Sequence, residues 1–340
     1  MKGSLLGWLF ALVILVSSSS AEAGYSNFFV FGDSLSDSGN NAIVFAPFTP
    51  NVTPVPISGN GFIPTYPYAS GHYTNNQIWA QTLASSLSLN VDPSLFGGTD
   101  YAFGGARTGP VTPNSFPGGG LLNPFPPTLE TQAASFLLQY ANIAPSDALY
   151  VVAGGGNDAR DALNAIGGCS GDASCINGIF SSTAAIYATN IETIVNELES
   201  AGAKNIVVWD TPDLGKAPAI LDSGAQASAL GSFVASTMNS ALLNALAGDL
   251  NIKLFDLYGL MDSWVANPGD FRLTNVTDAC AHVACDPSKY LFWDGIHPTS
   301  AGHQLISNAM FGLVTVPEPS FLALLILGLV SLRFCHRKPA

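Results

Sequence analysis

One serine in the chain has the sequence context of a nucleophile. Ser34 lies in the run GDSLSDSGN, residues 32–40, which directly follows the apolar stretch 28–31. Such a stretch is typical of a buried strand, so Ser34 is expected where a strand ends and a turn begins. Because a serine hydroxyl is too weak an acid to attack a carbonyl unaided, the chain must also supply a base, a group that orients the base, and donors for the developing oxyanion.

The base and its orienting group are expected in the run DGIHP, residues 294–298. His297 offers an imidazole, and Asp294 offers a carboxylate three residues earlier on one short loop. The carboxylate would accept the imidazole N–H, fix its tautomer and stabilise the imidazolium. Asp33 and Asp37 are interpreted instead as turn-forming groups, because a carboxylate that crowds the nucleophile would oppose the developing oxyanion.

Two glycine-containing runs lie between these blocks: GGA at residues 104–106 and GGGND at residues 154–158. The four blocks, in this order, resemble those of the GDSL or SGNH hydrolase family, whose members are esterases, lipases and related acyl-transfer enzymes. The resemblance extends over residues 28–314 of the chain.

The resemblance implies a role for each of five residues. Ser34 is similar to the family's nucleophile, and His297 and Asp294 are similar to the rest of its catalytic triad. The backbone N–H of Ser34, the backbone N–H of Gly105 and the side-chain amide of Asn157 are similar to its oxyanion donors.

Two of these assignments have alternatives. The resemblance places the glycine donor to within one position, so the donor is either Gly104 or Gly105. A glycine in either place lets the main chain approach a substrate closely. Asn157 has the alternative role of capping the helix or turn that follows GGGND, as asparagine commonly does.

Two longer runs, residues 71–84 and 292–303, look like those of the longer branch of the family, which contains plant esterases and bacterial lipases. At residues 71–76 that branch more usually has GRFSNG. Here His72 replaces the arginine and Asn76 replaces the last glycine, so the resemblance leaves the shape of the pocket at these positions open.

The implied reaction is a two-step acyl transfer through an acyl-enzyme, with no cofactor and no metal. The family branch favours lipid-like or aliphatic esters as substrates. A lipid acyltransferase that passes the acyl group to an alcohol, or a carbohydrate deacetylase, would use the same site. A different class, a non-catalytic exported surface or matrix protein, also fits the C-terminal pattern described below.

Apolar strand-like runs alternate with helix-like stretches along the chain, which predicts a parallel sheet with helices on both faces. Strands are expected at 28–31, 148–153, 205–209 and 252–256, with a weaker one at 100–103, and helices at 78–87, 129–140, 176–198, 225–246 and 301–312. The fold class is therefore α/β, a three-layer α/β/α sandwich in one domain, and the resemblance implies the flavodoxin-like SGNH hydrolase fold. Ligands bind beyond the carboxyl ends of such strands, so the four blocks are expected to converge.

Two irregular segments, residues 47–68 and 107–127, are rich in proline or glycine and follow chemical blocks. They are expected to wall the acyl or leaving-group pocket, with flexible surface loops as the alternative. GGGND lacks the spacing of a dinucleotide-binding or P-loop motif, and the chain has no G-x-S-x-G. These observations argue against nucleotide binding and against an α/β-hydrolase elbow.

Both ends of the chain resemble targeting segments. Residues 1–23 have one lysine, an apolar core and a final Ala-Glu-Ala, which predicts a secretory signal peptide cut after Ala23, with a retained membrane anchor as the alternative. Residues 316–340 contain VPEPS, a short apolar run and a basic tail, which resembles a PEP-CTERM sorting signal, with a plain C-terminal anchor as the alternative. The hydrolase domain is accordingly expected at residues 24–315.

These segments predict export from a Gram-negative bacterium to a periplasmic, cell-surface or extracellular location. The implied partners are the export and sorting machinery, with transient membrane association through the C-terminal segment. Residues 24–315 carry 7 basic and 22 acidic residues, a formal charge of −15. Because this charge repels phosphate backbones, nucleic acid is not expected as a partner.

Four cysteines lie in residues 24–315, in the close pairs Cys169/Cys175 and Cys280/Cys285. Export brings a protein into oxidising conditions, so two local disulfides are expected. A metal site is the alternative, but the spacings differ from those of ordinary zinc ribbons and no set of histidines accompanies them.

Overall fold

A computed structural model describes residues 24–47, 57–63, 66–110 and 125–315 of the chain. The larger compact unit of the chain is Tyr25–Met310. The expected signal peptide at residues 1–23 and the expected sorting segment at residues 316–340 lie outside the described residues.

A parallel sheet forms the centre of the larger unit. Its strands are β1 (Phe28–Gly32), β2 (Leu149–Ala153), β3 (Asn205–Trp209) and β4 (Ile252–Phe255), and they lie side by side in that order. The register places Val30 opposite Val151 and Val151 opposite Val207. Every residue of β1 and β2 is buried, as expected for strands covered on both faces. All four strongly predicted strands are confirmed.

The weaker predicted strand runs along the other edge of β1 as an irregular segment. The N–H groups of Tyr101 and Phe103 donate to the carbonyls of Val30 and Gly32 over 2.8 and 3.2 Å, and Val30 N–H donates to the Thr99 carbonyl over 3.2 Å. Consequently β1 has residues 99–103 on one side and β2 on the other, and both come after β1 in the sequence. Strand order reverses at this point, which is where sheets of this kind bind ligands.

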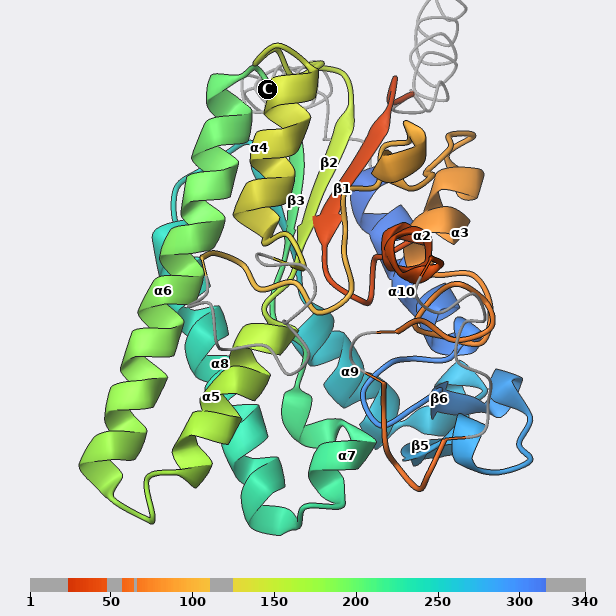
Figure 1. Ribbon diagram of the computed structural model, residues 1–340, viewed down its shortest axis with the longest axis vertical. Coiled ribbons are helices and arrows are strands. Elements are labelled where there is room, and N and C mark those ends of the chain that lie inside the picture. The colour runs from red at the N-terminus through yellow and green to blue at the C-terminus, as the bar shows by residue number, and fades with distance from the viewer. Residues whose placement is uncertain (1–23, 48–56, 64–65, 111–124, 316–340) are drawn as a thin grey trace, which may run out of the picture. The chain divides into compact units, whose positions relative to one another are not determined.

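Helices cover both faces of the sheet (Figure 1). On one face lie α4 (Leu129–Gln139), α6 (Ala173–Ser200) and α8 (Ala225–Ala245), which share a core with alternate residues of β1–β3 such as Phe29 and Phe31. On the other face lie α3 (Trp79–Ser86) and α10 (Ser300–Thr315). The Trp79 ring packs 4.5 Å from that of Trp209 in β3, measured between centroids. The three-layer α/β/α sandwich is therefore confirmed.

Several short elements have no strong pattern in the sequence. They are α2 (Asn40–Phe45), α5 (Gly156–Gly167), α7 (Pro218–Leu221), α9 (Leu257–Ala266), β5 (Asn275–Ala279), β6 (Tyr290–Phe292) and single 3₁₀ turns at Ser94–Phe96, Leu214–Lys216, Pro268–Phe271, Cys280–His282 and Pro287–Lys289. Within the described ranges, no helix is both long enough and apolar enough to cross a membrane.

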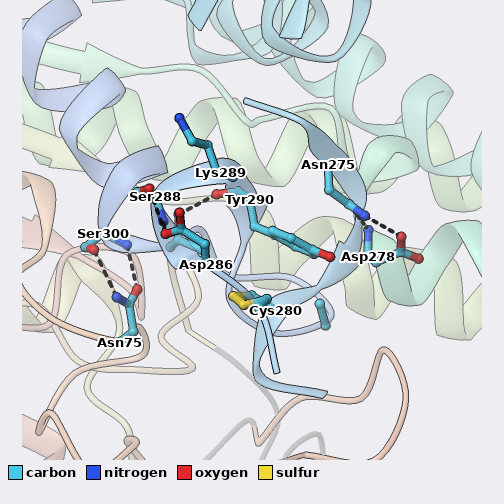
Figure 2. The surroundings of a disulfide bond; sticks show 12 residues. Asn75, Asn275, Asp278, Cys280, Asp286, Ser288, Lys289, Tyr290 and Ser300 are labelled. Atoms are coloured by element: carbon cyan, nitrogen blue, oxygen red, sulfur yellow. Dashed lines mark hydrogen bonds between the residues drawn. A yellow bond between two sulfur atoms is a disulfide. The ribbon is translucent and has the colours of Figure 1, made fainter. Parts of the chain in front are cut away.

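The structure contains both expected disulfides. Cys169–Cys175 connects the end of α5 to the start of α6, and Cys280–Cys285 lies in the turn between β5 and β6. Figure 2 shows Cys280 with neighbouring side chains, including Tyr290 of β6. Cys280 is fully buried and packs in one apolar cluster with Tyr68 and Trp293.

Candidate active site

Three neighbouring segments of the sheet end at the same edge, and each is followed by one chemical block. Ser34 follows β1, the two glycines Gly104 and Gly105 follow the irregular segment beside β1, and Asn157 follows β2 in the first turn of α5. The loop with Asp294 and His297 comes from a different place, between β6 and α10. The fold therefore brings together the residues predicted for the site.

Ser34, His297 and Asp294 form a continuous hydrogen-bonded chain. The Nε2 atom of His297 lies 2.7 Å from the Ser34 Oγ, and its Nδ1 atom lies 2.6 Å from the Asp294 Oδ2. Asp294 is 0%, His297 2% and Ser34 8% exposed. Because a carboxylate only accepts, the imidazole proton belongs on Nδ1, which leaves Nε2 free to accept the serine proton.

The loop holds Asp294 in place through its other oxygen. The backbone N–H groups of Ile296 and His297 donate to the Asp294 Oδ1 over 2.8 and 2.7 Å, which closes a tight turn between the acid and the imidazole. The Trp293 N–H also donates to the His297 carbonyl over 2.8 Å. These bonds orient the carboxylate before any substrate arrives.

Two tyrosines that the sequence analysis missed contact the triad. The Tyr68 hydroxyl donates to the Asp294 Oδ2 over 3.0 Å, and the Tyr73 ring lies 5.2 Å from the imidazole of His297. Burial and the Asp294 carboxylate raise the pKa of Tyr68, so its hydroxyl remains a donor. Tyr68 ends the proline-rich segment 47–68, and no local pattern distinguishes it from other tyrosines.

The structure favours Gly105 over Gly104 as a donor to an oxyanion. The Gly104 N–H donates to the Asp37 Oδ2 over 2.8 Å, so it is already engaged. Among the described residues, neither the Gly105 N–H nor the Ser34 N–H donates to any acceptor. Gly105 has a φ of +85°, a backbone conformation that strongly favours glycine.

Asn157 is held at both ends of its amide and does not cap α5. The residue at the N-cap is Gly155, and no side chain caps this helix. The Asn157 Nδ2 donates to the Ala106 carbonyl over 2.9 Å, and the Arg160 Nη1 donates to the Asn157 Oδ1 over 3.1 Å. One Nδ2 hydrogen is left for a ligand. The alternative of a helix cap is therefore wrong.

Asp33 and Asp37 hold the turn around the nucleophile. Asp33 accepts from the Leu35 N–H over 3.0 Å through Oδ1, and Asp37 accepts from the Gly39 N–H over 2.9 Å as well as from Gly104. Burial raises the pKa of each to about 6, while these N–H donors oppose the rise. Neither carboxylate bonds the imidazole of His297, so their role as turn-forming groups is confirmed.

A buried asparagine pair connects the nucleophile turn to the glycine block. Asn40 Nδ2 donates to the carbonyls of Asp100 and Ala102, each over 2.9 Å, and Asn41 Nδ2 donates to the Gly104 carbonyl over 3.0 Å. Both asparagines are fully buried. Asn40, the last residue of the GDSLSDSGN run, and Asn41, directly after it, thus connect the nucleophile turn to the segment that carries the glycine donor.

His72 and Asn76, the two departures from the usual family pattern, contact each other. The His72 Nδ1 lies 2.9 Å from the Asn76 carbonyl oxygen, and its Nε2 lies 3.2 Å from the Ser38 carbonyl oxygen. Burial lowers the pKa of His72. This histidine therefore contacts the main chain of the nucleophile turn at Ser38.

The described ends of the two irregular segments meet in an aromatic cluster formed by Phe45, Tyr66, Phe103 and Phe125. The Phe45 ring lies 4.8 Å from Tyr66 and 5.4 Å from Phe125, and the Phe125 ring lies 6.0 Å from Phe103. Phe103 directly precedes the glycine block, so apolar rings adjoin the oxyanion donors. Residues 48–56, 64–65 and 111–124 of these segments lie outside the described residues.

Among the residues that the structure describes, no three His, Cys, Asp or Glu side chains form a group that could hold a metal ion. The four cysteines of residues 24–315 are paired with each other, and the imidazole of His297 is engaged on both sides. The chemistry that this arrangement supports is attack by an activated serine on a carbonyl carbon.

Known proteins share this sequence pattern. The esterase EstA of Pseudomonas aeruginosa is 31% identical over 343 aligned positions, which cover 91% of this chain and 50% of EstA. A GDSL esterase/lipase of Arabidopsis thaliana is 28% identical over 83% of this chain and 85% of its own. The chain spans about half the length of the Pseudomonas esterases that it matches.

The chain was also compared with solved structures and with sequence models of protein families. The extracellular lipase of Streptomyces rimosus superposes with a TM-score of 0.43 at 15% identity, over 84% of this chain and 99% of the lipase. Residues 28–310 match the sequence model of the family described as GDSL-like Lipase/Acylhydrolase. Since that match spans most of the chain and includes all four chemical blocks, this protein belongs to the GDSL-like lipase/acylhydrolase family.

Proposed function

We propose that this protein is an exported serine ester hydrolase that works through an acyl-enzyme. The observation that carries the proposal is the hydrogen-bonded chain from Ser34 through His297 to Asp294. Beside this chain lie two backbone N–H groups without acceptors among the described residues and an oriented amide on Asn157. A nucleophile, a base and oxyanion donors are the parts that acyl transfer requires.

In the first step the Ser34 Oγ attacks the ester carbonyl carbon while its proton moves to the His297 Nε2. The carbonyl oxygen becomes an oxyanion that accepts from the N–H groups of Ser34 and Gly105 and from the Asn157 amide. Asp294 stabilises the imidazolium that forms. The imidazolium then gives its proton to the departing alcohol oxygen, and the carbon–oxygen bond to that alcohol breaks.

In the second step water attacks the acyl-enzyme. His297 removes a proton from the water, a second oxyanion forms on the same donors, and the carbon–oxygen bond to Ser34 breaks. The imidazolium returns its proton to the Ser34 Oγ, and a carboxylic acid leaves. An alcohol in place of water would give a transferase, which is the nearest alternative activity for this site.

The proposed substrates are lipid-like or aliphatic esters. The aromatic cluster of Phe45, Tyr66, Phe103 and Phe125 next to the oxyanion donors supports an apolar acyl group, and relatives are named esterases and lipases. The test is hydrolysis of p-nitrophenyl esters from acetate to palmitate by the purified protein. Activity that falls steeply beyond acetate would favour a deacetylase, and no activity together with no labelling by a fluorophosphonate would favour a non-catalytic surface protein.

Replacing Asn157 with alanine is expected to lower kcat by about 100-fold to 1,000-fold, because one of three oxyanion donors is lost. KM should change little, since the donor acts mainly on the transition state. The measurement is steady-state hydrolysis of p-nitrophenyl butyrate. Asn164→Ala, an exposed asparagine on the same helix, is the matched control and should leave kcat unchanged. Equal kcat values for both variants would remove Asn157 from the mechanism.

Loss of the Cys280–Cys285 disulfide is expected to lower kcat several-fold, whereas loss of Cys169–Cys175 is not. Ala281 lies within the loop that Cys280–Cys285 closes, and its N–H donates to the Trp293 carbonyl over 2.8 Å. Because Trp293 precedes Asp294, this disulfide supports the loop that carries Asp294 and His297. Each short closed loop stabilises the fold by about 2 kcal/mol. Double serine variants of each pair, compared for Tm and kcat, separate the two effects. Equal kcat values in both double variants would contradict the expectation.

For the chain ends we propose cleavage of residues 1–23 as a signal peptide and processing of residues 316–340 as a PEP-CTERM-like sorting signal, with the hydrolase domain at residues 24–315. The sequence patterns of both ends support this proposal. Intact-mass measurement of the protein from a Gram-negative host that carries the sorting machinery tests it. A mature chain that starts at Met1 or ends at Ala340 would contradict the corresponding half.

A further inference from the structure

Arg160 places a positive charge beside the oxyanion donors. It lies in α5, three residues after Asn157, and its Nη1 donates to the Asn157 Oδ1 over 3.1 Å. Its guanidinium carbon lies 4.4 Å from the centroid of the Phe62 ring, so the ring covers one face of the cation. Both side chains are half-buried and retain some contact with solvent.

The guanidinium of Arg160 has no anionic partner among the residues that the structure describes. No carboxylate oxygen of the described residues lies within the 4.0 Å that defines an ion pair with Arg160. Arg107 differs in this respect, since its Nε and Nη2 bind both oxygens of Asp161 over 2.9 and 2.8 Å. Burial, with a contribution from the charge of Arg107, lowers the pKa of Arg160. A partly desolvated charge without a partner costs free energy that a bound anion would recover.

Three carboxylates act on Arg160 through their charge without forming an ion pair with it. Asp161 is bound by Arg107, and Asp33 accepts from the Leu35 N–H through Oδ1. Asp294 accepts from His297, Ile296 and Tyr68 through both of its oxygens. They stabilise the cation from a distance, but none of them accepts a hydrogen bond from the guanidinium. In the described structure its Nε and Nη2 donate to no acceptor.

We propose that Arg160 is a specificity-determining residue that binds a carboxylate or phosphate group carried by the ester substrate. The proposal rests on the proposed esterase function. A guanidinium presents parallel N–H groups whose spacing matches both oxyacids, and such charge-assisted bonds are strong. Because Arg160 also bonds Asn157, the anion that it binds lies close to the scissile ester. The favoured substrates are therefore esters that carry one carboxylate or phosphate group, with the apolar part against the aromatic cluster or Phe62.

Two pairs of esters test the proposal, one for each side of the scissile bond. On the acyl side, p-nitrophenyl hemisuccinate carries a carboxylate and p-nitrophenyl butyrate does not. On the alcohol side, 1-butyrylglycerol 3-phosphate carries a phosphate and 1-butyrylglycerol does not. The quantity to compare is the ratio of kcat/KM for the anionic member to that for the neutral member, in the wild type and in Arg160→Gln and Arg160→Lys.

In at least one pair, Arg160→Gln is expected to lower this ratio by about tenfold or more, and Arg160→Lys by less, because lysine retains the charge. Any effect through the position of Asn157 acts equally on both members of a pair and cancels in the ratio. Unchanged ratios in both pairs would overturn the proposal and leave Arg160 as a positioning residue for Asn157. The pair that responds identifies which side carries the anion.

Calorimetry with the Ser34→Ala variant separates failure of this proposal from failure of the esterase function. Succinate and glycerol 3-phosphate are titrated into Ser34→Ala and into Ser34→Ala with Arg160→Gln. Binding of either anion that weakens about tenfold on loss of Arg160 would support the anion site even if no ester is hydrolysed. Binding that is absent, or equal in both variants, would overturn the proposal even if neutral esters are hydrolysed.

Discussion

Ser34→Ala is expected to lower kcat for p-nitrophenyl butyrate by about six orders of magnitude, which is the effect of removing the nucleophile of a hydrogen-bonded triad in a serine protease. The Ser34 Oγ is the atom that lies 2.7 Å from the His297 Nε2, and it follows β1 at the edge of the sheet where the donors converge. The residual rate should approach that of oxyanion stabilisation and binding alone. Steady-state hydrolysis and labelling by a fluorophosphonate both measure the effect.

Ser38 provides the matched control for this substitution. It lies in the same GDSLSDSGN turn, and its backbone N–H donates to the Asp100 Oδ2 over 2.7 Å, a bond that alanine retains. Its Oγ makes no hydrogen bond to a triad residue or to any other described residue. Ser38→Ala should therefore keep most of the activity and still label with the fluorophosphonate. If Ser34→Ala retained the activity of Ser38→Ala, the acyl-enzyme mechanism proposed here would be wrong.

His297→Ala is expected to lower kcat to a similar extent, because the base and the later proton donor are the same imidazole. Two of its ring contacts, to Ser34 and to Asp294, are shorter than 2.8 Å, and the Tyr73 ring lies against it. Loss of the base should also slow labelling of Ser34 by the fluorophosphonate, since an unassisted hydroxyl reacts slowly. The rate of labelling is thus a second measurement, independent of ester turnover.

His303 is a second buried histidine of the same sequence run and serves as the control. Its Nδ1 accepts from the Trp79 N–H over 3.2 Å, and burial lowers the pKa of His303 to about 3, so the neutral ring acts as an acceptor. His303→Asn keeps an acceptor in a similar place. This variant should have a lower Tm but most of the wild-type kcat. A large loss of kcat with an unchanged Tm in His303→Asn would assign the proton transfer differently.

Arg160 places a local positive charge in a protein whose overall charge is strongly negative. Residues 24–315 have a formal charge of −15, which repels anions in general. A local guanidinium beside the oxyanion donors would select anionic esters against this background. The ratio of kcat/KM for the anionic ester to that for the neutral ester should therefore depend on ionic strength. High salt is expected to raise this ratio, because salt screens the overall repulsion more than it screens the partly buried contact at Arg160.

The layered fold was largely predictable from local patterns. The strands β1–β4 and the helices α3, α4, α6, α8 and α10 coincide closely with their predicted ranges, because continuous apolar runs and helical periodicity reflect burial on both faces or on one face. Helix α5 was missed because it begins in a glycine-rich block. There Gly155 adopts a φ of +117°, and a side chain in its place would collide with Thr211, a contact that depends on the fold.

The sequence by itself determined the chemical groups of the site, because the GDSL, GGA, GGGND and DGIHP blocks each specify residue types at fixed local spacing. Only the tertiary structure decided which of them meet. The contact between Ser34 and His297 joins positions 263 residues apart, and the choice of Gly105 over Gly104 depends on a hydrogen bond from Gly104 to Asp37. Such contacts arise from the packing of whole elements, which leaves no trace in local spacing.

The same reason explains the supporting residues that the sequence did not reveal. Tyr68 and Arg160 donate hydrogen bonds to Asp294 and Asn157, respectively, and neither stands in a recognisable motif. Their contacts depend on the position that the Tyr68 hydroxyl and the Arg160 guanidinium take once the chain has folded. Local sequence determines what a residue can donate or accept, whereas the fold determines which partner lies within hydrogen-bonding distance and whether water is excluded from the contact.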